Sequence, residues 1–370
     1  MKPKILFLLH LPPPVTGATI VGENIKNSKH INLKYEADFI NLTTAFSLDS
    51  IGQGGLKKIS TILKTALVII KTLSQKKYDL CYMTLTAKGP GFYKDSLNVL
   101  LLKFFKIKIV YHFHNKGVKE NSNNWLNKFI YRNVFKNTKT ILLAKSLYKD
   151  IDLFVDKKNV FFCPNGVIPI KNHKKHTSKN KKKNYNLFFL SNMMEEKGVY
   201  KLLEACAILS KKNIFYNCHF VGAWSDITKE KFDEKCRNLE ISKNVFYHGK
   251  KYGVEKQYFY NTADIFVFPT YYHNECFPLV LLEAMQNSLP IISTYEGGIP
   301  SIIDHGKTGF LIKQKNVLEL ANKIEYLLKN PKESKIMGRN GKEKFENLFT
   351  LEKFETLITT IFDNIISNPN

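Results

Sequence analysis

The sequence predicts an α/β protein of two domains, each built on a doubly wound parallel sheet. The chain has 370 residues, which exceeds the roughly 100 to 200 residues of one ordinary domain. Hydrophobic residues make up 44% of the chain, enough for packed cores. Short apolar strings alternate with segments of helical period, and this alternation is typical of parallel sheets with crossover helices.

The first domain is expected over residues 1–170. It begins with a fully apolar run, Ile5 to Leu9, which a loop of prolines and Gly17 joins to a helical stretch. Apolar runs of this length are typical of strands that are buried on both faces of a parallel sheet. Further strands of this kind are expected at residues 79–84, 108–113, 140–144 and 159–163.

The clearest periodic element of this domain is a helix over residues 56–73. One face is apolar and is expected to pack on the core, while lysines recur every seven residues on the opposite face. The lysine face is interpreted as solvent-exposed, with contact to anionic lipid headgroups as the alternative. The apolar residues are Leu56, Ile59, Leu63, Leu67 and Ile70, and the lysines are Lys57, Lys64 and Lys71.

A change of composition separates the two domains. Residues 171–183 lack apolar side chains and cannot pack, so they are interpreted as a basic linker or loop. The α/β alternation then restarts, and the second domain is expected over residues 184–349. A final amphipathic helix, at about residues 350–370, must bury one face and is expected to return to the first domain.

The net charge of +24 admits nucleic acid, an anionic membrane surface or a small anionic ligand as partner. Nearly all cations are lysines, and the only arginines are Arg132, Arg237 and Arg339. Proteins that bind nucleic acid usually use the bidentate guanidinium more often, so no nucleic-acid partner is expected. A general lysine bias of the source organism is an alternative explanation for much of the excess.

The cysteines and the apolar runs bear on location. The six cysteines show no metal-ligand spacing, and they are expected as buried thiols in a reducing compartment. The N-terminal apolar run is too short for a signal peptide, and no later run reaches about 18 apolar residues. We therefore expect a cytoplasmic protein without a bound metal. A peripheral position on the inner face of the cell membrane is a further hypothesis.

The strongest candidate site surrounds two glutamates near a predicted helix start. Glu275 lies in a loop after an apolar strand, and Glu283 lies in a helix that is expected to begin at Pro278. A helix N-terminus at the carboxyl edge of a parallel sheet is a place where phosphate binds, so Phe277 and Leu279 also belong to this candidate site. The two carboxylates could accept hydrogen bonds from a sugar and a ribose on either side of a diphosphate.

Two further loops lie at predicted carboxyl edges. The loop from Ser191 to Gly198 follows the first strand of the second domain, and Lys197 in it could neutralise a diphosphate as its charge grows. In the first domain His112 and His114 close a strand, and the alternation of side chains places both on one face. Which of them faces a ligand depends on the strand register.

Six motifs occur in a characteristic order between residues 114 and 311. They are His114, the PNGV of residues 164–167, Lys197-Gly198, the E-x7-E of Glu275 and Glu283, the GGIP of residues 297–300 and the TGFL of residues 308–311. Together they resemble the GT-B glycosyltransferases of family 4, the retaining enzymes of glycosyl transferases group 1. The resemblance implies two Rossmann-like domains that face a cleft, with the donor bound mainly by the second and the acceptor mainly by the first.

The resemblance also implies roles for single residues. Glu275 matches the contact to the transferred sugar, Glu283 the contact to the ribose hydroxyls, and Lys197 the cation that stabilises the departing diphosphate. His114 matches a histidine near the reaction centre, and Gly17 a loop where the backbone approaches the ligands. The reaction would be metal-independent, with a nucleotide-diphosphate sugar as co-substrate and no cofactor.

One position departs from the family pattern. The family usually has Gly-Arg where this chain has Ser191-Asn192. Asn192 can still donate a hydrogen bond to a donor, but it brings no charge. No arginine elsewhere in the sequence is an evident replacement.

The predicted function is transfer of a sugar from a nucleotide-diphosphate sugar to a lipid-linked or polysaccharide acceptor in surface glycan biosynthesis. One alternative is a nucleotide-sugar epimerase of the same architecture, which would convert the donor alone into its isomer. A second alternative is a non-catalytic polyanion-binding protein, which would bind RNA or heparin with a steep salt dependence.

Overall fold

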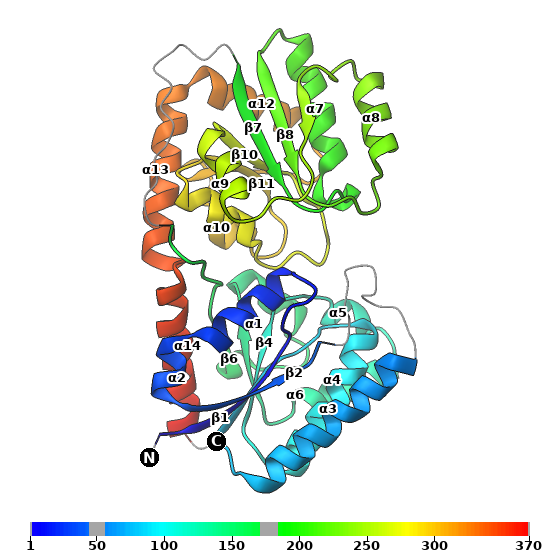
Figure 1. Cartoon of the computed structure of the whole chain (residues 1–370), viewed down its shortest axis with the longest axis vertical. Helices are drawn as coiled ribbons and strands as arrows, with labels where there is room; N and C mark the ends of the chain where they lie inside the picture. Colours follow the sequence, from blue (N-terminus) through cyan, green and yellow to red (C-terminus); the bar gives the residue numbers. More distant parts are fainter. Residues whose placement is uncertain (1, 44–55, 171–183, 369–370) are drawn as a thin grey trace. The chain divides into compact units, whose positions relative to one another are not determined.

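A computed structural model describes residues 2–43, 56–170 and 184–368 (Figure 1). The chain divides into two compact units, one formed by Met1–Asn165 with Glu352–Asn370 and the other by Gly166–Leu351. Among the described residues each unit contains one six-stranded sheet, and every strand pairing in both sheets is parallel. The predicted class, two doubly wound parallel sheets, is confirmed. The predicted basic linker, 171–183, lies outside the described residues.

The sheet of the first unit has the strand order β2-β1-β3-β4-β5-β6. The strands β3 and β4 are buried along their whole length, as their apolar sequences predict. The order reverses beside β1, which lies between β2 and β3, and ligands of doubly wound sheets bind at such a point. The bounds are β1 (Lys4–Leu9), β2 (Glu36–Asn41), β3 (Leu80–Thr84), β4 (Ile109–Phe113), β5 (Lys139–Leu142) and β6 (Val160–Phe162).

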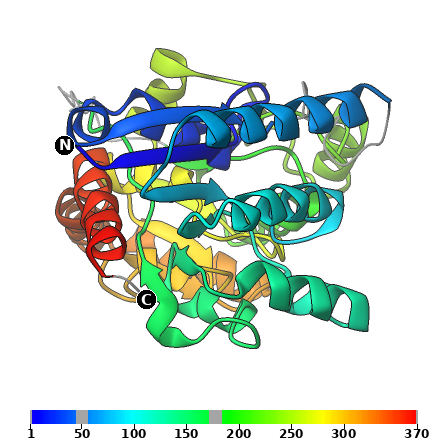
Figure 2. The same ribbon diagram turned by 90° about the horizontal axis from the view of Figure 1, so that it is seen from below.

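Helices of the first unit cover this sheet, and three of them form a layer. Figure 2 shows α3, α4 and α6 side by side, and α4 contacts both of the others. The last helix, α14 (Leu351–Ser367), packs on the same sheet, because the ring of Phe362 lies 5.9 Å from that of Phe7 and 5.4 Å from that of Tyr82. The other bounds are α1 (Gly17–Asn27), α2 (Lys29–Lys34), α3 (Leu56–Gln75), α4 (Gly89–Phe104), α5 (Val118–Asn121), α6 (Trp125–Phe135), η1 (Lys145–Asp150) and η2 (Lys157–Asn159).

The core face of α3 differs from the sequence prediction. Leu63, Leu67 and Ile70 were expected in the core, but all three are exposed, and Ile69 and Leu73 are the buried positions. The helix carries apolar residues around most of its circumference, so its period alone could not select the face that packs. The side chains of residues 56–59 lie outside the described part of the chain, which leaves that portion of the prediction untested.

The lysines of α3 also lie on a different side from the one expected. Lys64 and Lys71 are both exposed. Because an α-helix turns by 100° per residue, these lysines lie on the same side of the helix as the exposed Leu63 and Leu67 and not opposite them. The solvent side of α3 is therefore both apolar and cationic.

The sheet of the second unit has the strand order β12-β11-β10-β7-β8-β9. Its order reverses between β7 and β10, so the loops after these two strands leave the carboxyl edge side by side. The strand bounds are β7 (Tyr185–Leu190), β8 (Tyr216–Val221), β9 (Val245–Tyr247), β10 (Ile265–Phe268), β11 (Ile291–Thr294) and β12 (Gly309–Ile312). The helices are η3 (Glu195–Lys197), α7 (Val199–Lys211), α8 (Lys229–Asn238), α9 (Gly253–Thr262), α10 (Leu279–Gln286), α11 (Ile299–Ile302), α12 (Val317–Lys329) and α13 (Pro331–Leu348).

Two further sequence expectations can be compared with the structure. All six cysteines are buried, as predicted. Within the described ranges, no helix combines the length and the apolar character that a bilayer span requires.

Candidate functional site

Three loops of the second unit meet at the carboxyl edge of its sheet. The loop after β10 accepts a bond from the loop after β11, since the Gly298 amide donates to the Cys276 carbonyl at 2.7 Å. The loop after β10 also donates to the loop after β7, since the Tyr271 amide bonds the Glu196 carbonyl at 2.7 Å. The meeting point lies where the strand order reverses, the place at which open α/β sheets bind ligands.

Lys197 and Glu275 come together at this edge. The Lys197 Nζ lies 2.6 Å from Glu275 Oε2, although 78 positions separate the two residues. Only 14% of the Lys197 side chain and 11% of the Glu275 side chain are exposed. The ammonium also lies 4.2 Å from the ring centroid of Tyr272, within cation–π range. A partly buried ammonium and carboxylate thus face each other through a charge-assisted hydrogen bond.

Two glycines allow this close approach of loops. Gly198 follows Lys197 with φ of +88°, and a side chain there would collide with the Pro269 carbonyl oxygen. Gly297 has φ of +55°, and a side chain there would collide with the carbonyl oxygen of Glu275 itself. Both positions therefore need glycine, and each fixes the loop that carries one member of the ion pair.

Glu283 lies on α10 and is held by a different set of residues. One carboxylate oxygen accepts from Lys256 Nζ at 2.7 Å, and the other accepts from the Tyr260 hydroxyl at 2.9 Å. Burial, and then the charge of Glu283, raise the pKa of Tyr260 well above its usual value, so this hydroxyl remains a donor. The carboxylate is thus oriented before any ligand arrives.

The start of α10 differs by one residue from the prediction. Pro278 has an extended backbone, with ψ of 118°, and acts as the N-cap, while the helix begins at Leu279. Proline has no side-chain acceptor, so the first-turn amides of α10 have no side-chain cap. Phe277 turns its ring toward that of Phe349 at 5.7 Å and is buried, so a ligand would meet its backbone.

In the first unit the two histidines differ in their surroundings. His112 is fully buried, and its Nδ1 lies 2.7 Å from the Tyr82 hydroxyl, so Tyr82 holds its ring in the core. The ring of His114 lies 4.3 Å from that of His112, and both of its ring nitrogens are buried without a hydrogen-bond partner among the described residues. Burial, and then the proximity of His10, lower the pKa of His114 to about 3, so its imidazole is neutral at pH 7.

Gly17 and Asn192 lie in the connections that follow the first strand of each unit, β1 and β7. Gly17 is the first residue of α1, after the N-cap Thr16, and a Cβ there would meet no atom within 4 Å. Packing therefore does not demand a glycine at this position. Asn192 follows β7, and its carbonyl accepts from the Met194 amide at 2.8 Å.

Sequence reasoning missed the partners of the predicted residues. Tyr272 under Lys197, and Lys256 and Tyr260 beside Glu283, come from separate segments, and no motif in the sequence marks them. In the described part of the chain no cluster of three or more metal-ligating side chains is found.

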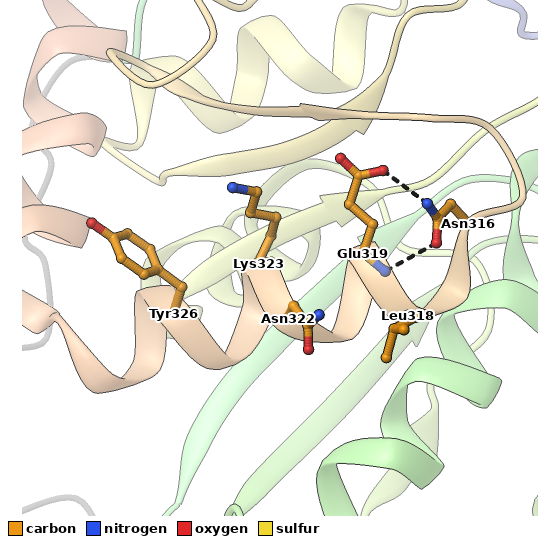
Figure 3. Close-up of a pocket in the computed structure, with 6 residues that line it drawn as sticks. All are labelled: Asn316, Leu318, Glu319, Asn322, Lys323 and Tyr326. Atoms are coloured by element: carbon orange, nitrogen blue, oxygen red, sulfur yellow. Dashed lines mark hydrogen bonds between the residues drawn. The ribbon is translucent and has the colours of Figure 1, made fainter.

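A surface hollow lies elsewhere in the second unit (Figure 3). It contains none of the predicted site residues, and it is lined by Asn316, Leu318, Glu319, Asn322, Lys323 and Tyr326. The Glu319 carboxylate accepts from Asn316 Nδ2 at 3.1 Å, and Lys323 lies over the Phe310 ring. Because none of the predicted site residues lines this hollow, we do not place the ligand site there.

A protein-family model described as glycosyl transferases group 1 matches residues 169–344, the part of the chain that carries Lys197, Glu275 and Glu283. Residues 169–344 are a glycosyl transferases group 1 domain. The match includes the three loops that meet at the carboxyl edge and the helix that carries Glu283.

Relatives of known name agree with this assignment. The capsular polysaccharide biosynthesis glycosyltransferase CapM of Staphylococcus aureus is 28% identical over 181 residues, which cover 48% of this chain and 46% of CapM. The chain spans about half, or less, of the length of CapM and of the next two curated relatives.

Solved structures show the same fold over the whole chain. A glycosyltransferase from Rickettsia africae superimposes with a TM-score of 0.78 at 18% identity, covering 100% of both chains. HepE from Anabaena, solved in complex with UDP and glucose, has a TM-score of 0.74 at 17% identity, covering 97% of this chain and 99% of HepE. The chain has the GT-B fold of these proteins.

Proposed function

We propose that this protein is a retaining glycosyltransferase of family 4, which moves a sugar from a nucleotide-diphosphate donor to an acceptor in surface glycan biosynthesis. The observation that carries the proposal is the Lys197–Glu275 pair, at the carboxyl edge where β7 meets β10 inside a glycosyl transferases group 1 domain. The HepE complex with UDP and glucose supports a nucleotide-sugar donor for this fold.

The donor is proposed to bind residues 184–349. Its diphosphate would lie at the start of α10, contacted by the backbone amides of Phe277 and Leu279, while Pro278, which has no N–H, would line the site between them. The partial positive charge of the helix favours an anion there. Lys197 would turn from Glu275 to the diphosphate, and Asn192 would donate a hydrogen bond where relatives have an arginine. Glu275 is then released to accept from sugar hydroxyls, while Glu283 accepts from the ribose.

The reaction proposed uses no metal. As the bond from the anomeric carbon to the diphosphate oxygen breaks, the acceptor hydroxyl forms its new bond on the same face, so the anomeric configuration is retained. The hydroxyl proton passes to the departing diphosphate oxygen. Lys197 stabilises the negative charge that grows on this leaving group, and such stabilisation is usually the largest single contribution to the rate.

The first domain, residues 1–170 with the returning helix, is proposed to receive a lipid-linked or oligosaccharide acceptor. Gly17 would let the backbone of α1 approach the ligands closely, because it has no side chain and stands in open space. His114, neutral and with both ring nitrogens unpaired, would form a hydrogen bond near the reaction centre. We propose a cytoplasmic enzyme that works at the inner face of the cell membrane, on glycans of the kind that CapM's name indicates.

The proposal is tested by incubating the protein with a panel of nucleotide-diphosphate sugars, each with and without acceptor. We expect a product only with acceptor, and proton NMR of the anomeric centre should show the configuration of the donor. Conversion of a donor to its isomer without acceptor would instead identify an epimerase.

Variants test the proposed residues. Glu275→Gln and Lys197→Ala should each reduce turnover by about a hundredfold or more without unfolding the protein. The matched controls are Glu204→Gln and Lys201→Ala, which alter a second Lys–Glu pair of 2.9 Å on α7. Near-normal transfer by either site variant would refute its assigned role.

A further inference from the structure

Three neighbouring helices of the first unit turn large apolar side chains toward solvent. The helices are α3, α4 and α6, which lie side by side in one layer (Figure 2). Phe104 is 80% exposed, Trp125 78% and Phe129 61%, which is unusual for aromatic residues of this size. We call the following set the apolar face: Leu63, Leu67, Val68 and Ile70 of α3; Tyr93, Leu97, Leu100 and Phe104 of α4; and Trp125, Leu126 and Phe129 of α6.

The middle helix, α4, is apolar on its solvent side and buries polar residues beside apolar ones. Its polar residues Asp95 and Asn98 are buried, with 0% and 1% of their surface exposed. Its exposed residues at 93, 97, 100 and 104 follow the spacing i, i+4, i+7 and i+11, which forms one apolar stripe along the solvent side. A helix of a water-exposed surface normally shows the opposite pattern. A contiguous exposed patch of this kind marks an interaction surface.

The exposed charges that these three helices carry are of one sign. The sequences of α3, α4 and α6 contain a single acidic residue, Asp95, which is buried. Among the described side chains, the exposed charges on these helices and within two residues after them are all cations: Lys64, Lys71, Lys77, Lys106, Lys128, Arg132 and Lys136.

A general lysine bias of the sequence does not explain this arrangement. Helices α8 and α13 of the second unit are also rich in lysine, yet each interleaves its cations with carboxylates, as Glu230, Asp233 and Glu234 show on α8. What distinguishes the layer of α3, α4 and α6 is the absence of exposed acids from its sequences, which selects for an anionic partner.

We propose that the apolar face docks on the surface of an anionic lipid bilayer. Tryptophan and phenylalanine would enter the boundary between headgroups and acyl chains, and the surrounding cations would contact the headgroups, as in helices that lie in the plane of a membrane. Each cation near such a surface adds to the attraction. A second copy of the chain is a poorer occupant, because a symmetric contact would set cations against cations.

The purpose of this surface rests on the proposed function. A bilayer held against α3, α4 and α6 would bring the first domain to a lipid-linked acceptor without any membrane-spanning helix. Binding to the bilayer itself requires neither donor nor acceptor, so the two proposals can fail separately.

The test uses the position of the two tryptophans. The variant Trp224→Phe leaves Trp125 of the apolar face as the sole tryptophan. With vesicles that contain phosphatidylglycerol, we expect the fluorescence of Trp125 to shift to shorter wavelength, because the indole leaves water. Vesicles of phosphatidylcholine alone should produce little change, and added salt should weaken the binding. An unchanged spectrum with phosphatidylglycerol vesicles would overturn the proposal.

Variants of the apolar face provide the second measurement. Leu100→Ser combined with Phe104→Ser should weaken sedimentation with phosphatidylglycerol vesicles about tenfold or more, and both residues are exposed, so the fold should be retained. The matched control is Phe215→Ser combined with Val254→Ser, at exposed apolar positions of the second unit. Equal vesicle binding by the two double variants would contradict docking on lipid by this face. A wild-type protein that is a dimer, with a Leu100/Phe104 variant that is a monomer, would also contradict it.

A third measurement separates the two proposals. The Leu100/Phe104 variant should keep its nucleotide affinity in a thermal-shift assay and its transfer to a water-soluble acceptor, while transfer to an acceptor embedded in vesicles should fall. If the wild-type protein binds vesicles but shows no affinity for nucleotides, the docking surface is supported and only the proposed function is refuted.

Discussion

Replacing Lys197 by methionine should destabilise the second unit more than replacing Glu275 by glutamine. Removing one member of a buried ion pair leaves the other charge uncompensated, which costs about 3 to 5 kcal/mol when burial is complete. Because 11% of the Glu275 side chain remains exposed, we expect Lys197→Met to cost about 2 to 4 kcal/mol. Glu275→Gln should cost about 1 to 2 kcal/mol, since Lys197 retains its contact with the Tyr272 ring.

The double variant Lys197→Met/Glu275→Gln should be more stable than the sum of the single effects indicates, by about 1 to 3 kcal/mol. Urea unfolding measures all four proteins, and a Trp125→Phe background makes Trp224, which stacks on Tyr247 at 3.8 Å, the sole reporter of the second unit. The double variant should be folded yet inactive. If the losses of unfolding free energy in the two single variants simply add up in the double variant, the two side chains do not stabilise each other and the reasoning is refuted.

Three further predictions concern single positions. Gly306→Ala should lower the unfolding free energy by only about 1 kcal/mol, because φ is +78° but a methyl group would meet no other atom. Gly297→Ala should lower it by about 2 to 4 kcal/mol and reduce turnover, because its methyl group would collide with the Glu275 backbone. Thermal unfolding compares the two, and equal costs would contradict the account. Glu283→Gln should weaken UDP binding about tenfold in calorimetry, with Glu204→Gln as control, since the charged acceptor of the ribose hydroxyls is lost. Burial holds the pKa of His114 at about 3, below the usual 6.5, so its contribution to stability is complete above pH 6.5 and is lost as pH falls toward 3. The unfolding free energy of the His114→Asn variant should therefore fall less between pH 7 and pH 4 than that of the wild type. An equal dependence on pH in the two proteins would refute the burial argument.

The fold class was predictable because both sheets are buried on two faces. A strand such as β10 is a continuous apolar run, so it can be recognised from the sequence without knowledge of its neighbours in the sheet. The face of α3 was not predictable, because apolar residues surround the helix and only the neighbouring α4 and β2 decide which of them are covered. The prediction placed Leu63 and Leu67 in the core because it assumed that apolar side chains avoid the solvent side of a helix.

The candidate site was predictable in part. The sequence indicated that Lys197 and Glu275 belong to loops at one sheet edge, and the structure brings them to 2.6 Å. The partners of Glu283 could not be predicted, because Lys256 belongs to α9 and reaches α10 only through the packing of the two helices on the sheet. One lysine among the many in this sequence carries no local signal of such a role.

The claim at the centre of this account is that Lys197, Glu275 and Glu283 contact one donor. A crystal structure of the protein with a bound nucleotide-diphosphate sugar measures this directly. We expect the diphosphate on the Lys197 amine and the first amides of α10, the ribose on Glu283 and the sugar on Glu275. A nucleotide bound in the hollow of α12, or at any place that leaves the Lys197–Glu275 pair intact and uncontacted, would contradict it.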